Sequence, residues 1–169
     1  MVIIPSGLTF VATPRTASKA ITEALLRKHK DAISDYPQDH HMWFEDVPRD
    51  YPIYTVIRNP VDQIISWWNH VDVQANKSKR RPLQFAKEYS NIMYLPKDDK
   101  YRLNIYAEIA NVFMIYDSKL LTVTKILKLD DLQVVGKSKV KIHKEERMEL
   151  SNYIDHAFIH DVELWNSKQ

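Results

Sequence analysis

The chain has 169 residues, of which 44% are hydrophobic and 11% aromatic, and this composition is typical of a single globular domain over residues 1–169, not of a disordered chain. Its 24 basic and 22 acidic residues give a formal net charge of +2, too small to indicate nucleic acid or a membrane surface as the main partner. The absence of cysteine excludes disulfides, thiolate catalysis and cysteine-ligated zinc, and it suits a reducing compartment, so we expect a cytoplasmic protein.

The first half of the chain predicts two buried strands, each followed by a helix. The N-terminus lacks the basic start and long apolar run of a secretory signal, and residues 8–13 (LTFVAT) form a short β-favouring run. Residues 18–30 place apolar side chains at helical spacing and end in a basic turn. Residues 53–58 (IYTVIR) predict the second strand. An Asn–Pro pair then predicts a helix over residues 59–73, because Asn caps helices and Pro favours their first position.

The second half predicts a third strand between helices. A helix opens at Pro82, and residues 112–116 (VFMIY) are the strand. Residues 118–128 predict a further helix, and residues 144–165 are mostly helical with an interruption near His156. No stretch approaches the roughly 18 consecutive apolar residues of a membrane span. Strands that alternate with helices predict an α/β fold in three layers, with a short central parallel sheet and helices on both faces.

In such folds ligands bind at the carboxyl ends of the strands, and the first motif follows the first strand. Residues 13–20 (TPRTASKA) join that strand to a helix whose N-terminus favours an anion. Arg15 and Lys19 add positive charge, and Thr16 and Ser18 add hydroxyl donors. The segment contains no glycine, so the GxxxxGK(S/T) pattern of magnesium-dependent nucleotidases is absent. The alternative is an ordinary capped helix with exposed basic residues.

The second motif follows the second strand. Arg58 ends the strand, and Ser66 lies eight residues later in the predicted helix, so the two side chains could hold one phosphate from two sides. Alternatively, Arg58 pairs with a surface carboxylate and Ser66 is an ordinary polar residue of the helix.

Taken together, these motifs resemble the sulfotransferases that use 3′-phosphoadenosine-5′-phosphosulfate (PAPS). Residues 14–20 (PRTASKA) are similar to their 5′-phosphosulfate loop, and residues 56–68 (VIRNPVDQIISWW) are similar to their 3′-phosphate stretch. The uronyl 2-O-sulfotransferase branch also has a histidine-containing segment before the second strand. Residues 39–44 (DHHMWF) occupy the corresponding position in this chain. The resemblance is clear over residues 10–70 and faint over residues 114–121 and 156–165. Ala17 stands where the cytosolic branch commonly has glycine, although alanine occurs in the carbohydrate branch, and Lys19 stands where a second hydroxyl is usual.

The resemblance implies a P-loop-like fold with PAPS as sulfuryl donor, PAP as product and no required metal. The residues implied to bind the donor are Arg15, Thr16, Ala17, Ser18, Lys19, Ala20, Arg58, Ser66 and Lys139, with Lys137 as the alternative late contact. Arg15, supported by Lys19, is expected to stabilise the charge on the leaving 5′-phosphate, and His41 to take the proton from a hydroxyl or amine acceptor. We expect the acceptor to be a small molecule or a glycan.

Other interpretations stay open at this point. The same fold could be a non-catalytic module that holds PAP, or, with less support, a small nucleotide kinase. His40 is the second candidate base, and both histidines could instead be solvated or bind adventitious metal. Residues 77–81 (KSKRR) could attract an anionic acceptor or form an exposed loop tip, and Trp67 and Trp68 could stack on adenine or belong to the core.

Overall fold

The computed structural model describes residues 1–13, 15–34, 51–74, 80–93, 112–116, 125–129 and 141–167. The chain forms two compact units. Unit 1 comprises Met1–Arg58 and Lys100–Val135, and unit 2 comprises Asn59–Asp99 and Gly136–Gln169. Each unit is assembled from two separate stretches of the chain.

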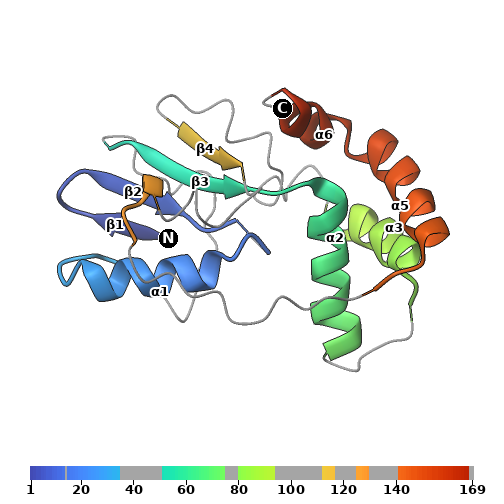
Figure 1. Ribbon diagram of the computed structural model, residues 1–169, viewed down its shortest axis with the longest axis horizontal. Helices are drawn as coiled ribbons and strands as arrows, with labels where there is room; N and C mark the ends of the chain where they lie inside the picture. The colour runs from blue at the N-terminus through green and yellow to red at the C-terminus, as the bar shows by residue number, and fades with distance from the viewer. Residues whose placement is uncertain are drawn as a thin grey trace. The chain divides into compact units, whose positions relative to one another are not determined.

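Unit 1 contains a four-stranded sheet in the order β1-β2-β3-β4 (Figure 1). The strands are β1 (Val2–Ile4), β2 (Leu8–Val11), β3 (Ile53–Ile57) and β4 (Val112–Tyr116). β2, β3 and β4 run parallel to one another, and β1 pairs antiparallel with β2. The carboxyl ends of β2 and β3 therefore lie at the same edge of the sheet.

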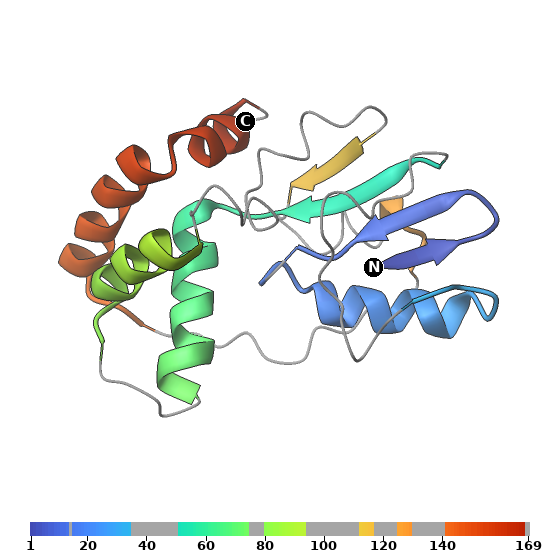
Figure 2. The same ribbon diagram turned by 180° about the vertical axis from the view of Figure 1, so that it is seen from behind.

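The helix α1 (Ser18–Lys28) covers one face of this sheet (Figures 1 and 2). Ile21 and Leu25 of α1 are fully buried and belong to one apolar cluster with Phe10 and Val56. The side chains that alternate with these along the strands point to the opposite face and are also fully buried: Thr9, Val11, Ile53, Thr55 and Ile57. A sheet buried on both faces is typical of parallel α/β architecture.

Unit 2 is helical in its described part. Its elements are α2 (Pro60–Trp68), a π-helical continuation η2 (Asn69–Gln74), α3 (Pro82–Met93), α5 (Lys144–Ala157) and α6 (Ile159–Asn166). Figure 2 shows α2, α3 and α5 packed side by side. Their contacts enclose a second apolar cluster of buried residues: Val61, Ile64, Ile65, Phe85, Ala86, Leu150, Ile154 and Phe158.

The α/β class predicted from the sequence is confirmed as a mixed sheet with helices, and the three strands expected are present. The sheet is not purely parallel, however, because β1 adds an antiparallel edge strand that the sequence pattern missed. β1 has only three residues, too few to show a period of two. The helix predicted over residues 59–73 is present but changes to π-helical geometry at Asn69. Most of the helix predicted over residues 118–128 lies outside the described residues. In the part of the chain that the structure describes, no helix is long and apolar enough to cross a bilayer.

Candidate functional site

The turn between β2 and α1 has an unusual backbone. Arg15 has a φ of 63° and Ala17 a φ of 62°, and Thr16 between them does not have a positive φ. A left-handed conformation costs a residue with a Cβ roughly 1–2 kcal/mol. Alternating backbone conformations of this kind turn successive N–H groups toward one side, which makes a concave site for an anion. Two strained residues separated by a single residue are typical of functional loops.

The N-terminus of α1 is also left without the usual stabilising groups. Ala17 occupies the N-cap and provides no side-chain hydrogen bond, and the first turn carries no acidic residue. α2 shows the contrast: Asn59 accepts hydrogen bonds from the backbone N–H groups of Val61 and Asp62 at 3.0 and 3.3 Å, and Asp62 places a carboxylate in the first turn. The partial positive charge of α1 is therefore available to an external anion.

The side chains of the loop divide between the interior and the surface. Thr16 is fully buried, and its hydroxyl donates to the backbone oxygen of Thr13 at 2.8 Å, so what Thr16 can offer a ligand is its backbone N–H. Ser18 is buried at the first position of α1, and its hydroxyl has no hydrogen-bond partner among the described residues. Lys19 is exposed in the same turn, and Ala20 is partly buried.

Arg58, the first residue of the second motif, contacts the first motif. Its Nη1 donates a hydrogen bond to the backbone oxygen of Arg15 at 3.1 Å. Within the described residues Arg58 forms no ion pair with a carboxylate, which removes the alternative that a surface carboxylate among them holds it. Partial burial and then the neighbouring Arg58 charge lower the pKa of Arg15. Arg15 and Arg58 thus place two positive charges at the carboxyl ends of β2 and β3, and these charges favour an anion there.

Two residues that the sequence analysis did not single out support this loop from below. Thr13 and Thr55 are fully buried, and their hydroxyl oxygens lie 3.1 Å apart. Thr13 also donates to the backbone oxygen of Val56, and Thr55 donates to that of Val11 at 3.1 Å. Threonine in apolar strand runs is ordinarily a β-former, so the threonines at position 55 within β3 and position 13 just after β2 gave no distinct signal in the sequence.

The left-handed Ala17 gives a direct test of loop strain. We expect Ala17→Gly to stabilise the protein by about 0.5–1 kcal/mol, because glycine removes the left-handed penalty and only part of the gain is offset by the freedom of the unfolded chain. Denaturant unfolding measures the change. Ala24→Gly in the middle of α1 is the control and should destabilise by about 1 kcal/mol or more. A destabilised Ala17→Gly protein would contradict the strained backbone.

The remaining residues of the second motif belong to unit 2. Ser66 is partly buried on α2. Trp67 and Trp68 pack against the apolar cluster of unit 2, and the indole nitrogen of Trp68 donates to the backbone oxygen of Arg80 at 2.8 Å. Both tryptophans therefore serve the core, which was the second of the two interpretations considered.

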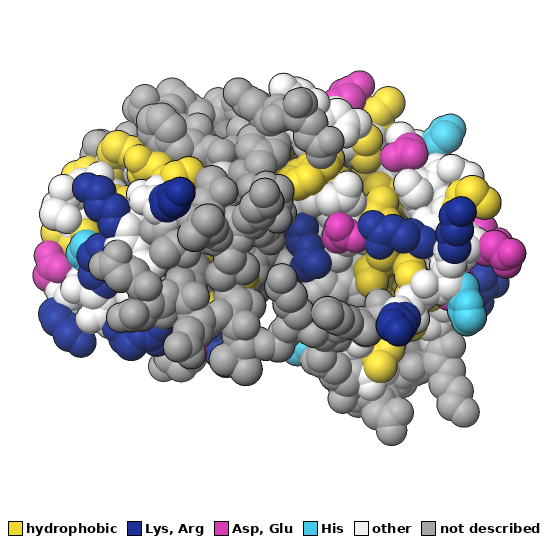
Figure 3. Space-filling model, in the orientation of Figure 1, with side chains coloured by type: hydrophobic (Ala, Val, Ile, Leu, Met, Phe, Trp, Pro, Cys, Tyr) yellow, Lys and Arg dark blue, Asp and Glu magenta, His cyan; other side chains and the backbone are white. Residues whose placement is uncertain are grey.

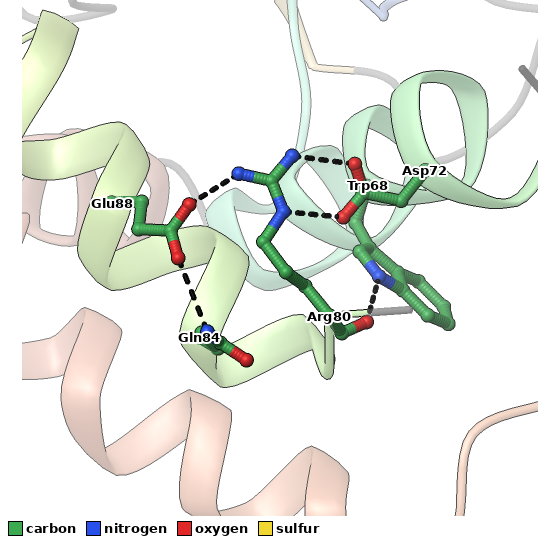
Figure 4. Close-up of polar contacts among 5 residues, drawn as sticks. All are labelled: Trp68, Asp72, Arg80, Gln84 and Glu88. Atoms are coloured by element: carbon green, nitrogen blue, oxygen red, sulfur yellow. Dashed lines mark hydrogen bonds and ion pairs between the residues drawn. The ribbon is translucent and has the colours of Figure 1, made fainter. Parts of the chain in front are cut away.

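The described part of the basic run is occupied by ion pairs. Arg80 forms a bidentate pair with Asp72, at 2.9 Å from Nε and 2.6 Å from Nη2, and bonds Glu88 through Nη1 (Figure 4). Arg81 pairs with Glu146 and Glu149. Figure 3 shows acidic side chains beside basic ones over unit 2. Neither arginine is available as an anionic-acceptor site while these pairs persist.

Several predicted site residues lie outside the described residues: His40, His41, Lys137 and Lys139, together with residues 77–79 of the basic run. Among the residues that are described, no group of histidine and carboxylate side chains is arranged to hold a metal ion. The structure thus brings Arg15, Thr16, Ser18 and Arg58 together in unit 1, whereas Ser66 belongs to unit 2. Comparisons with protein-family models, curated proteins and solved structures found no match to this chain.

Proposed function

We propose that the chain is a PAPS-dependent sulfotransferase with a P-loop-like core. The observation that carries the proposal is the anion loop: a helix N-terminus without cap or carboxylate, two left-handed residues before it, and the Arg15–Arg58 pair beside it. A nucleotide with phosphates at both its 5′ and 3′ ends carries negative charge that complements these positively charged groups. The sequence resemblance supports PAPS as the particular nucleotide.

In the proposed reaction, the acceptor oxygen or nitrogen attacks the sulfur of PAPS while the bond from sulfur to the 5′-phosphate oxygen breaks, and PAP leaves. Arg15, with Lys19, stabilises the negative charge that accumulates on that leaving oxygen. His41 takes the proton from the acceptor. Arg58, Ser66 and Lys139 are assigned to the 3′-phosphate by resemblance. Most of the catalysis comes from positioning and charge, so no metal is assigned a role.

The acceptor in this proposal is a small molecule or a glycan, and the location is the cytoplasm. The competing proposal, favoured by the loop alone, is a non-catalytic PAP-binding module. The enzyme and the binding module would share the same donor site, but only the enzyme needs a catalytic base.

Substitution of His41 separates the enzyme from the binding module. We expect His41→Ala to reduce sulfuryl transfer from PAPS about 100-fold or more, because general-base catalysis contributes typically 10²–10⁴-fold, while PAP affinity stays within about twofold. Turnover is followed by release of PAP with a panel of hydroxyl and amine acceptors. His40→Ala is the matched control and should retain turnover. PAP binding with no turnover by the unsubstituted protein would favour the non-catalytic module.

A further inference from the structure

A hydrogen-bonded series of buried hydroxyl groups lies next to the anion loop. Its members are Thr13 at the end of β2, Thr16 in the loop and Thr55 on β3, and all three are fully buried. The Thr16 hydroxyl lies 2.8 Å from the Thr13 backbone oxygen and 3.3 Å from the Thr13 hydroxyl, and the Thr13 hydroxyl lies 3.1 Å from that of Thr55.

The three hydroxyl protons have three backbone acceptors. Thr55 donates to Val11 on β2, Thr13 donates to Val56 on β3, and Thr16 donates to Thr13. The first two bonds tie the ends of β2 and β3 to each other, and the third ties the loop to that junction. The loop residue fixed in this way, Thr16, sits between the two left-handed residues.

We propose that Thr13, Thr16 and Thr55 are positioning residues that hold the loop in its strained conformation and thereby set its affinity for a phosphate group. The inference rests on the proposed function only for the identity of the ligand. Without the hydroxyl anchor, Arg15 and Ala17 relax toward right-handed or extended conformations, because the bonds that fix Thr16 between them are then weakened and no longer offset the cost of the left-handed backbone. The N–H groups of the loop then no longer converge.

The same unit supplies a natural comparison. Thr9 on β2 and Thr22 on α1 are also fully buried, but neither hydroxyl has a hydrogen-bond partner among the described residues. Valine has nearly the shape of threonine. Replacement by valine at Thr9 therefore removes no hydrogen bond. Replacement by valine at Thr55 removes its hydrogen bonds to Val11 and Thr13.

The test compares Thr55→Val with Thr9→Val by hydrogen exchange at the amides of residues 15–20 and by PAP affinity. We expect Thr55→Val to accelerate loop exchange about tenfold beyond the change in global stability and to weaken PAP binding about tenfold. Thr16→Val should act in the same direction, and Thr55→Ser should restore both properties. Thr9→Val should leave both unchanged and keep or raise the melting temperature.

Equal loop exchange in Thr55→Val and Thr9→Val would overturn the inference. A Thr55→Val protein whose loop amides exchange faster only in proportion to its lower global stability would overturn it as well. Failure of the unsubstituted protein to bind PAP would contradict the proposed function instead, and the exchange comparison would still decide whether the threonines position the loop.

Discussion

Arg58→Ala is expected to weaken PAP binding about 100-fold or more while leaving the stability of the ligand-free protein nearly unchanged. A charge-assisted hydrogen bond to phosphate contributes about 1.5–3 kcal/mol, and Arg can form two such bonds at once. In the ligand-free protein the Arg58 charge lies beside Arg15 and contributes to the lowering of its pKa, so removing Arg58 also removes a repulsion. Isothermal titration with PAP and denaturant unfolding measure the two effects.

Two further variants sharpen this result. Arg58→Lys keeps the charge but loses the planar fork, and we expect it to recover only part of the affinity, leaving a loss of about tenfold. Arg147→Ala removes another arginine, one that pairs with Asp62 at 2.6 Å on the exposed surface of unit 2, and should leave PAP affinity unchanged. An equal loss in Arg58→Ala and Arg147→Ala would show only nonspecific attraction of the nucleotide.

Arg80→Met is expected to destabilise the protein by about 2–3 kcal/mol, because it removes the arginine that forms two hydrogen bonds with the buried Asp72 carboxylate. The Asp72 side chain is 1% exposed, and Arg80 holds it through two hydrogen bonds (Figure 4). These bonds, first that to Asp72 and then that to Glu88, raise the pKa of Arg80. The Arg80 side chain is 26% exposed, so solvent screens part of the interaction and we place the effect below the roughly 3–5 kcal/mol expected for a fully buried pair.

The double variant Arg80→Met with Asp72→Asn should recover at least half of this loss, since no buried charge is left unpaired. Arg81→Met is the matched control. Its ion pairs with Glu146 and Glu149 lie on the surface, with the Arg81 side chain 62% exposed, so its melting temperature should hardly change. If Arg80→Met were as mild as Arg81→Met, Asp72 would not depend on its partner.

The sequence predicted the regular elements well because their patterns are local. The strand runs around Phe10 and Val56 and the helical spacing after Ser18 each depend on residues within a few positions of one another. The left-handed conformations of Arg15 and Ala17 could not be predicted in this way, because neither residue is glycine and the hydrogen bonds between this region and β3 join residues 42 to 44 positions apart.

Side-chain roles were harder to predict than positions. Arg80 belongs to a run of basic residues that suggested attraction of an anionic ligand, yet its partners Asp72 and Glu88 lie eight residues away on either side. Charge runs alone do not reveal such pairs. Thr16 was expected to donate its hydroxyl to a ligand, and the structure turns that hydroxyl toward Thr13 instead. The proximity of Arg15 and Arg58, in contrast, followed from the rule that parallel strands bring their carboxyl ends together.

Thermal unfolding with PAP, ADP, AMP and ATP–magnesium, measured side by side, tests the proposed donor site most directly. A ligand at about 100 times its dissociation constant adds roughly 2.7 kcal/mol of stability, several degrees for a protein of this length. We expect PAP to raise the melting temperature and ADP, which lacks the 3′-phosphate, to raise it far less, because the site is proposed to bind both phosphates. Stabilisation by ATP–magnesium with no response to PAP would contradict the sulfotransferase proposal and favour a nucleotide kinase.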